Sequence, residues 1–282
     1  MDEKIYILMA TYNGEKYLKE QIDSLFSQTY QNWKLIIHDD NSKDKTVKII
    51  KDYQGKYADK IKLLEDNIST GGAKENFTYL LNNIDKQYDY IMFCDQDDIW
   101  LENKIEITLN KMLEVEKDNS GKAVLIHTDL KVVDEELNII SNSMFRYQKL
   151  NLYNVKDITK ISLENIITGC TMMLNKQLAA INKKIPQEAI MHDWWIAIIT
   201  LKENGIIEFV NYPTILYRQH AFNTIGSKKV NFLYYLSKLL KINEQIKNYK
   251  SIYSQYVHAG VKIDKLNFVF MKSMMVLKKV LK

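Results

Sequence analysis

The stretch Phe93-Cys94-Asp95-Gln96-Asp97-Asp98-Ile99-Trp100 places three carboxylates within four positions, directly after the apolar run Tyr90 to Cys94. An apolar run of this length between polar residues is typical of a buried strand in a parallel sheet. The acids then fall just beyond its carboxyl end, where open α/β sheets bind ligands. From the residues alone, two interpretations stay open: a cleft for a divalent cation with phosphate oxygens, or a solvated acidic turn before a helix.

Short apolar runs alternate with segments whose apolar residues recur at helical spacing. Between the first two runs, for example, Leu18, Ile22 and Leu25 recur every three or four positions. Strands that alternate with helices at this pace predict an α/β fold with a mostly parallel, doubly wound central sheet. No GxGxxG or GxxxxGK[ST] motif follows the first run, so neither a dinucleotide-binding fold nor a P-loop is supported. The predicted strands are Ile5 to Ala10, Leu35 to Ile37, Ile61 to Leu64, Tyr90 to Cys94 and Ala123 to Ile126.

The composition is that of a globular protein: of 282 residues, 46% are hydrophobic, 26% are charged and only 2 are proline. This length suits one large α/β domain with an appended segment. Cys94 and Cys170 lie in apolar stretches without metal-ligand spacing, so we expect two reduced core thiols in a cytosolic protein. The chain enters a strand at once and lacks any long uninterrupted apolar stretch, so we expect neither a signal peptide nor a transmembrane segment.

The charge divides the chain in two. Residues 226–282 carry 12 lysines against Glu244 and Asp264, a net charge of +10, which leaves −6 for the first 225 residues. This asymmetry predicts a body at 1–225 and a basic extension at 226–282 with an anionic partner. Amphipathic helices of this kind suit the inner face of an anionic membrane; packing on the body or formation of a homodimer is the alternative. Their apolar residues are Phe232, Leu233, Leu236, Leu239 and Leu240 in one segment and Phe268, Met271, Met275 and Leu277 in the other.

Polar clusters follow three of the predicted strands. Thr11 to Asn13 follows the first strand, Asp39 to Asn41 the second and Asp95 to Asp98 the fourth. Because the carboxyl ends of parallel strands meet at one edge of a sheet, we expect the three clusters to form a single site.

These clusters carry a family resemblance. Ala10-Thr11-Tyr12-Asn13, Asp39-Asp40-Asn41-Ser42 and Asp95-Gln96-Asp97-Asp98 resemble, in order and spacing, the nucleotide-sugar half of the family-2 inverting glycosyltransferases. Thr168-Gly169-Cys170, His192-Asp193-Trp194-Trp195 and Tyr217-Arg218-Gln219-His220 extend the match to about residue 225. The forms FCDQDDIW, HDWW and LYRQH are most similar to bacterial α-1,3-L-rhamnosyltransferases of rhamnose-polysaccharide synthesis. The resemblance implies the A-type glycosyltransferase fold, a Rossmann-like domain.

The resemblance also implies a donor site. Asp40 would accept a hydrogen bond from the pyrimidine N–H, and Tyr12 would stack on the base, with the neighbouring Thr11 and Asn13 close to it. Asp95 would approach the ribose, and Arg218 would contact the diphosphate. Gln96 belongs to the same set of nucleotide-sugar-binding residues. Helix capping is the alternative for Thr11 and Asn13, and an ion pair with a carboxylate is the alternative for Arg218.

The remaining implied roles concern the metal and the base. Asp97 and His220 would hold a divalent cation, Mg²⁺ or Mn²⁺, and Asp98 would either orient the pair or cap the next helix. Asp193 would be the general base, with an N-cap role as its alternative. Burial would raise the pKa of Asp193 while the helix dipole would lower it, and the sequence does not decide between them. Asp129 is a weaker candidate for contact with acceptor hydroxyls.

The predicted function is metal-dependent, inverting transfer of a sugar to a hydroxyl of a lipid-linked cell-wall or surface polysaccharide. The predicted donor is dTDP-β-L-rhamnose. One alternative is a UDP-hexose donor in the same family, and another is a non-catalytic nucleotide-sugar or glycan-binding subunit. A phosphohydrolase is disfavoured because Thr11-Tyr12-Asn13 stands where its nucleophile would be expected. No nucleic-acid partner is expected, whereas peripheral membrane contact and a homodimer stay open.

Overall fold

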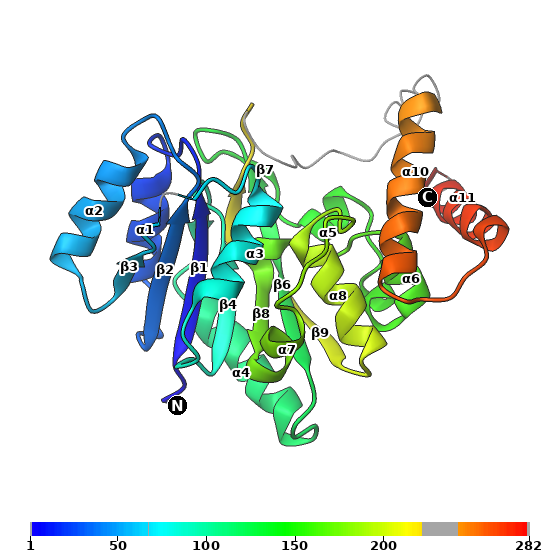
Figure 1. Ribbon diagram of the computed structural model, residues 1–282, viewed down its shortest axis with the longest axis horizontal. Coiled ribbons are helices and arrows are strands. Elements are labelled where there is room, and N and C mark those ends of the chain that lie inside the picture. Colours follow the sequence, from blue (N-terminus) through cyan, green and yellow to red (C-terminus); the bar gives the residue numbers. More distant parts are fainter. Residues whose placement is uncertain (1, 67, 222–241, 281–282) are drawn as a thin grey trace.

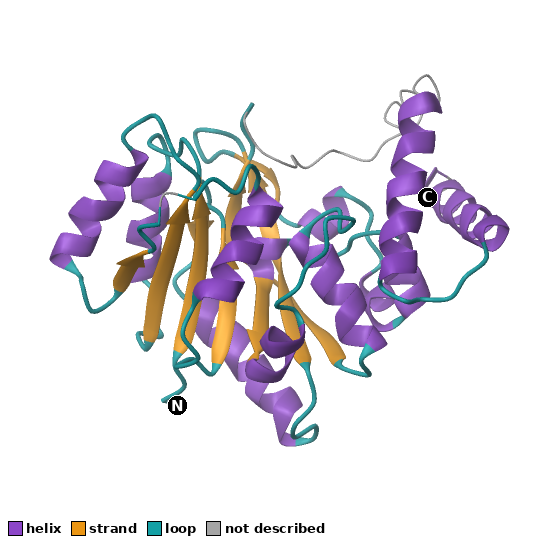
Figure 2. Ribbon diagram, viewed as in Figure 1, coloured by secondary structure: helices purple, strands orange, loops and turns teal. Residues whose placement is uncertain are grey.

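The central sheet organises the molecule. The computed structural model describes residues 2–66, 68–221 and 242–280. Within them, nine strands form one sheet in the order β3-β2-β1-β4-β8-β6-β9-β5, with β7 paired to β6. Figure 2 shows helices on both faces of this sheet. The prediction of an α/β fold with a mostly parallel sheet is confirmed.

The first half of the sheet is entirely parallel. β1 lies between β2 and β4, and β2 pairs with β3. Residue Thr11 of β1 is in register with Asp39 of β2, and Met9 is in register with Cys94 of β4. The three polar clusters therefore begin at one edge of the sheet. The elements of this half are β1 (Ile5–Thr11), α1 (Leu18–Phe26), β2 (Trp33–Asp39), α2 (Thr46–Lys56), β3 (Ile61–Leu63), α3 (Ala73–Asn83) and β4 (Tyr90–Cys94).

The second half mixes strand directions. β8 runs antiparallel to both β4 and β6, and β5 runs antiparallel to β9, whereas β6 and β9 are parallel. Its elements are β5 (Ile99–Trp100), α4 (Lys104–Lys117), β6 (Val124–Val133), β7 (Ile139–Ser141), α5 (Met144–Tyr147), η1 (Leu152–Lys156), α6 (Ile158–Leu163), η2 (Gly169–Thr171), β8 (Met172–Asn175), α7 (Lys176–Ile181), α8 (His192–Lys202) and β9 (Ile206–Arg218).

Strand β6 corrects one prediction. It was expected to end near Ile126, but it continues to Val133 through register shifts against β9 between Thr128 and Lys131. Asp129 lies inside this strand and is buried, and its Oδ1 accepts hydrogen bonds from Met144 N at 3.0 Å and from Phe145 N at 3.4 Å. Asp129 thus anchors the start of α5 and is not among the residues that line the cavity described below.

The core follows the period-two alternation of the strands. On β1, Ile5 and Ile7 contribute to the apolar cluster under α1 and α4, whereas Tyr6 and Leu8 contribute to the cluster under α3 and α8. Both faces of β1 are therefore buried, which explains why this strand contains no charged residue.

The C-terminal helices α10 (Ile242–His258) and α11 (Lys265–Val280) lie beside α6, at the end of the molecule opposite α2 (Figure 1). Ile252 of α10 and Phe268 of α11 are buried in the core cluster that also holds Ile161 of α6. The second predicted amphipathic segment thus coincides with α11, and the first, Phe232 to Leu240, lies outside the described residues. Among the described residues, none of the helices combines the length and the apolar character that crossing a bilayer requires.

Candidate active site

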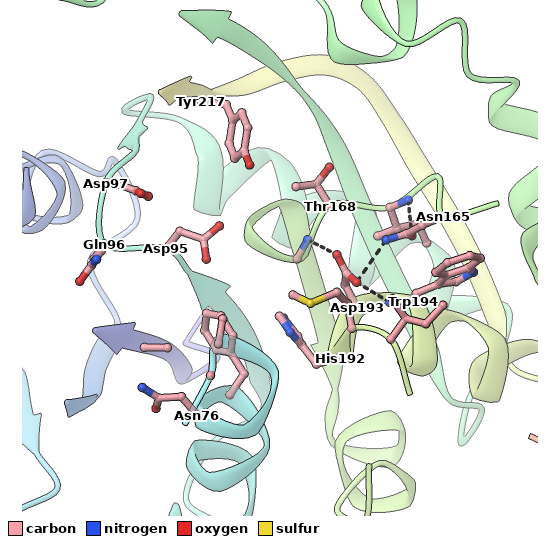
Figure 3. Close-up of a pocket in the computed structure, with 18 of the residues that line it drawn as sticks. Asn76, Asp95, Gln96, Asp97, Asn165, Thr168, His192, Asp193, Trp194 and Tyr217 are labelled. Atoms are coloured by element: carbon pink, nitrogen blue, oxygen red, sulfur yellow. Dashed lines mark hydrogen bonds between the residues drawn. The ribbon is translucent and has the colours of Figure 1, made fainter. Parts of the chain in front are cut away.

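A cavity of about 700 Å³ opens at the carboxyl ends of β1 and β4. Asp95 and Asp97 line one side, and Asp193 lies on the opposite side, as Figure 3 shows. The cavity is lined by Ala10, Thr11, Tyr12, Asp40, Ser69, Gly71, Gly72, Ala73, Asn76, Phe77, Asp95, Gln96, Asp97, Met144, Gln148, Leu150, Asn165, Ile166, Ile167, Thr168, Gly169, Ile190, Met191, His192, Asp193, Trp194 and Tyr217.

The loop after β1 is tied to the loop after β4. The side-chain amide of Gln96 accepts from the backbone N–H of Tyr12 and donates to its carbonyl, both at 2.9 Å. Gly14 makes room for this amide, because a Cβ at Gly14 would lie 2.2 Å from Gln96 Oε1. The Tyr12 side chain is 56% exposed and lines the cavity, so its ring is accessible to a planar ligand.

Asn13 and Asp40 differ in their access to the cavity. Asn13 has φ 47, and its Oδ1 accepts from Lys43 N at 2.8 Å, so its side chain closes the turn and is not among the lining residues. Asp40 lines the cavity, and its carboxylate accepts from Ser69 Oγ at 3.1 Å and from Gly71 N at 2.9 Å. Asp40 therefore anchors the 69–71 loop and still presents an acceptor edge to the cavity.

Arg218 lies beneath the loop of residues Asp95 to Asp98, which follows β4 and is called the acidic loop below. Its Nε donates to the carbonyl of Asp97 at 3.0 Å, Nη1 donates to the carbonyl of Glu135 at 2.6 Å, and Nη2 pairs with Glu20. The backbone N–H of Arg218 donates to Oδ1 of the fully buried Asp98 at 3.2 Å. Arg218 does not line the cavity, so it holds the acidic loop from behind. Asp98 likewise orients this loop. It does not cap the next helix, because the N-cap of α4 is Asn103.

The acidic loop concentrates negative charge. Burial raises the pKa of Asp95 to about 7, and repulsion from Asp97 and Asp193 adds to the shift. Burial, with repulsion from Asp97 and Asp95, also holds the pKa of Asp98 well above its usual range. A divalent cation would relieve this repulsion.

Two groups of side chains could hold that cation. Oδ2 of Asp97, which lines the cavity, lies 2.8 Å from Nε2 of His220, which is not among the lining residues, and the ligand atoms of Asp95, Asp98 and Cys170 lie within 4.8 Å of one another. Burial raises the pKa of the Cys170 thiol, so it stays protonated, and Mg²⁺ and Mn²⁺ prefer oxygen to sulfur. The Cys170 thiol is therefore not a suitable ligand for such a cation, and the candidate ligands are the carboxylates of the acidic loop and His220.

Asp193 is the second residue of α8, whose N-cap is Met191. Its Oδ2 accepts from Gly169 N at 3.0 Å, and its Oδ1 accepts from Asn165 Nδ2 at 3.2 Å and from Trp194 N at 2.6 Å. Despite these hydrogen bonds, burial raises the pKa of Asp193 to about 6. Burial thus outweighs the helix terminus, and the carboxylate can both lose and accept a proton near neutral pH.

Some lining residues escaped the sequence analysis. Asn165 lies between Glu164 and Ile166 and belongs to no recognised motif, so only its contact with Asp193 identifies it. His192 entered the sequence analysis only as part of the motif His192-Asp193-Trp194-Trp195, without a role of its own, yet it lines the cavity. Its position directly before the predicted base was the available signal.

The loop after β1, the acidic loop after β4 and the buried carboxylate of Asp193 across the cavity, carried on this sheet, define the class: a transferase with the A-type glycosyltransferase fold. The sequence profile of "Glycosyl transferase family 2" matches residues 6–180, more than half of the chain, and the chain belongs to that family.

Individual proteins agree with this assignment. The dTDP-rhamnosyl transferase RfbG of Shigella flexneri is 30% identical over 233 residues, which cover 78% of this chain and 74% of that protein. The UDP-Glc:alpha-D-GlcNAc-diphosphoundecaprenol beta-1,3-glucosyltransferase WfgD of Escherichia coli is 30% identical over 206 residues, 73% of this chain and 72% of that protein.

Among solved structures, the mannosyltransferase PcManGT from Pyrobaculum calidifontis, in complex with GDP-Man and Mn²⁺, superposes with a TM-score of 0.55. The match covers 94% of this chain but 66% of that chain, at 15% identity. At this identity the likeness concerns the fold alone.

Proposed function

We propose that this protein is an inverting, metal-dependent glycosyltransferase in which Asp193 is the general base. The observation that carries the proposal is the placement of a buried carboxylate with a pKa of about 6 across one cavity from the acidic loop at the end of β4. Such a carboxylate is mostly ionised at pH 7, and its pKa is close enough to neutrality for efficient proton transfer.

The reaction is a single displacement. The acceptor hydroxyl gives its proton to Asp193, and its oxygen forms a bond to the anomeric carbon of the donor sugar. The bond from that carbon to the phosphate oxygen breaks, and the nucleoside diphosphate leaves on the opposite face with the electron pair. Because base and leaving group lie on opposite sides of the sugar, a β-linked donor gives an α-linked product.

The acidic loop serves the leaving group. Asp97 and His220 would hold the divalent cation, which supplies positive charge to the departing diphosphate. Arg218 keeps the Asp97 carbonyl in place and thus fixes the loop. Asp40 and Tyr12 also line the cavity, where they suit the edge and the face of a pyrimidine base.

The donor is proposed to be dTDP-β-L-rhamnose. The name of the Shigella relative, a dTDP-rhamnosyl transferase, supports this choice. A UDP-hexose is the second candidate, because the Escherichia coli relative is named for UDP-Glc at the same level of identity. Both donors carry a pyrimidine with an N–H for Asp40, so the sugar distinguishes them.

The acceptor is proposed to be a lipid-linked glycan, and α11 is proposed to hold the enzyme at an anionic membrane. The diphosphoundecaprenol in the name of the Escherichia coli relative supports the first part. For the second, α11 buries Phe268 in the core, yet its outward face is apolar: Leu266 is 82% exposed, Phe270 64% and Leu277 49%. Exposed Lys265 and Lys278 flank this stripe, a pattern that fits an in-plane helix on an anionic surface.

The catalytic proposal is tested with the purified chain. Nucleoside diphosphate sugars are compared by thermal shift with and without Mg²⁺ or Mn²⁺, and stabilising donors are then offered with a lipid-linked glycan acceptor. We expect a metal-dependent shift with dTDP-rhamnose and a product of inverted configuration by NMR. Binding without transfer to any acceptor would instead support the non-catalytic subunit, and hydrolysis of a simple phosphomonoester would support a phosphohydrolase.

The membrane proposal is tested by co-sedimentation with vesicles of anionic or neutral lipid. We expect the full chain to sediment with anionic vesicles at low salt and to be released as salt rises, because lysine attraction is screened within about 8 Å at physiological ionic strength. The double variant Leu266→Ser and Phe270→Ser should stay in the supernatant. Tyr153→Ser removes an aromatic side chain that is 75% exposed elsewhere and should bind like the unaltered protein. If the double variant only abolishes dimerisation, the stripe is a subunit interface.

A further inference from the structure

Tyr17 is a buried aromatic residue that packs against His220. Its ring centroid lies 5.0 Å from that of the imidazole, and the two planes are tilted by 36°. The same ring lies 4.4 Å from Cζ of Arg218. Tyr17 is 8% exposed, directly precedes α1 and is not among the residues that line the cavity. One aromatic ring thus contacts both the histidine that pairs with Asp97 and the arginine that holds the acidic loop.

Tyr17 is itself fixed at both ends of the residue. Its backbone N–H donates to the carbonyl of Gly14 at 3.1 Å, and its own carbonyl accepts from Gln21 N at 3.2 Å. Its hydroxyl donates to Oε2 of Glu135 at 3.0 Å. Hydrogen bonds from Lys16 and Tyr17 lower the pKa of Glu135, so this carboxylate stays ionised at neutral pH and continues to accept from the hydroxyl. The ring can therefore act as a rigid support for its neighbours.

His220 is a side chain whose orientation needs such a support. It lies two residues beyond the end of β9, its side chain is 6% exposed, and its Nε2 lies 2.8 Å from Oδ2 of Asp97. Rotation about either side-chain torsion would separate these two atoms, and a ring packed against the imidazole restricts that rotation. In metal sites, neighbours that orient a ligand typically change the metal affinity by a factor of roughly 10 to 100.

We propose that Tyr17 is a positioning residue whose ring holds the imidazole of His220 against Asp97. It acts through His220 rather than on the donor, because it does not line the cavity. The ring carries this role and the hydroxyl assists it, since the ring makes the contact with His220 and the hydroxyl reaches only Glu135. The expected consequence for cation binding rests on the proposed function, in which Asp97 and His220 hold the cation.

Tyr6 provides a matched control. It is 1% exposed, its hydroxyl donates to Oδ1 of Asp85 at 2.7 Å, and its ring centroid lies 5.5 Å from that of Tyr88. Nζ of Lys4 lies 5.6 Å from this centroid. Tyr6 therefore has the same kinds of neighbours as Tyr17. Asp85, however, precedes the amino end of β4, at the edge of the sheet opposite the acidic loop.

The first test is made without metal. Tyr17→Leu removes the ring, Tyr17→Phe keeps the ring without the hydroxyl, and Tyr6→Leu removes the control ring. In proton NMR, the proton held between His220 and Asp97 should give a slowly exchanging downfield signal, identified by its loss in His220→Gln. We expect the signal in the unaltered chain, in Tyr17→Phe and in Tyr6→Leu, and its loss in Tyr17→Leu. Its persistence in Tyr17→Leu, or its absence from the unaltered chain, would overturn the inference.

The second test measures the binding of Mn²⁺ alone, with the free ion followed by electron paramagnetic resonance. The Kd should rise roughly 10-fold in Tyr17→Leu and stay close to that of the unaltered chain in Tyr17→Phe and Tyr6→Leu. If Tyr17 only stabilises the fold, Tyr17→Leu lowers the melting temperature and keeps the Kd, which would contradict the inference.

Two further outcomes separate this inference from the proposed function. If the unaltered chain binds no Mn²⁺, the metal-dependent function is contradicted, and the NMR signal still decides whether Tyr17 holds His220. If Tyr17→Leu does not fold, Tyr17→Met replaces it, because the flexible methionine side chain fills the space without an aromatic ring.

Discussion

Nε2 of His220 lies 2.8 Å from Oδ2 of Asp97, although 123 positions separate the two residues in the chain. The pair joins the end of β9 to the acidic loop after β4. A divalent cation at this pair is expected to be required for turnover. Asp97→Asn should therefore lose most of the transfer rate and keep its melting temperature, because the loop backbone stays held by Arg218. Transfer assays and thermal unfolding check this, and full turnover in excess chelator would remove the metal from the mechanism.

Asp193→Asn keeps the size of the side chain but cannot accept a proton. Transfer should fall by a factor on the order of 10² to 10⁴, with donor affinity little changed. Asp129→Asn is the matched control, because burial also raises the pKa of Asp129 but its side chain does not line the cavity. That variant should lose stability while each folded molecule keeps its turnover. Normal transfer in Asp193→Asn would show that Asp193 is structural.

The transfer rate should depend on the ionisation of Asp193. The pKa of this carboxyl is about 6, and only the ionised form accepts a proton. The rate should therefore rise as pH increases through about 6, roughly tenfold per pH unit on the acid side, and level off above it. The assay uses saturating cation, whose positive charge would favour the ionised form of Asp95, so that Asp193 sets this limb. A rate profile that is flat between pH 5 and pH 7 would contradict the assignment.

Arg218→Lys keeps the positive charge but loses the planar fork that reaches the carbonyls of Asp97 and Glu135. We expect a loss of about 2 kcal/mol in the free energy of unfolding, because buried hydrogen bonds to a charged group are broken. Turnover should fall as well, since the acidic loop loosens. Arg146→Lys, at the only other arginine of the chain, is exposed on α5 and should change stability by less than about 0.5 kcal/mol. Denaturant-induced unfolding measures the free energy of unfolding of both variants. Unchanged stability in Arg218→Lys would show that the planar guanidinium is not needed to hold the acidic loop.

The strands of the first half could be predicted because nearly every position of β1 and β4 is apolar and both faces are buried. The end of strand β6 could not be predicted from the sequence. Asp129 and Lys131 resemble the polar end of a strand, and only the hydrogen bonds from Met144 and Phe145 explain a carboxylate inside it. The reversed direction of β8 was equally hidden, since direction depends on pairing with β4 and β6 rather than on its own residues.

The site residues likewise include some that could be predicted from the sequence and some that could not. The sequence suggested Asp95, Asp97 and Asp193 as residues of one site, and the structure brings them to one cavity, where their roles stay predictions. The position of Arg218 behind the loop depends on Glu20 and on the Glu135 carbonyl, which are distant in sequence. His192 stands directly before Asp193 in the sequence, but only the folded structure shows that it lines the cavity.

The two hydrogen bonds between Gln96 and the backbone of Tyr12 join the loop after β1 to the acidic loop. Any ligand that orders one loop lowers the entropic cost of ordering the other. Binding linkage is reciprocal, so a cation that strengthens nucleotide binding by some factor must itself be bound more tightly, by the same factor, when the nucleotide is present. A coupling carried by this amide would therefore appear equally in the affinity for the cation and in the affinity for the nucleotide.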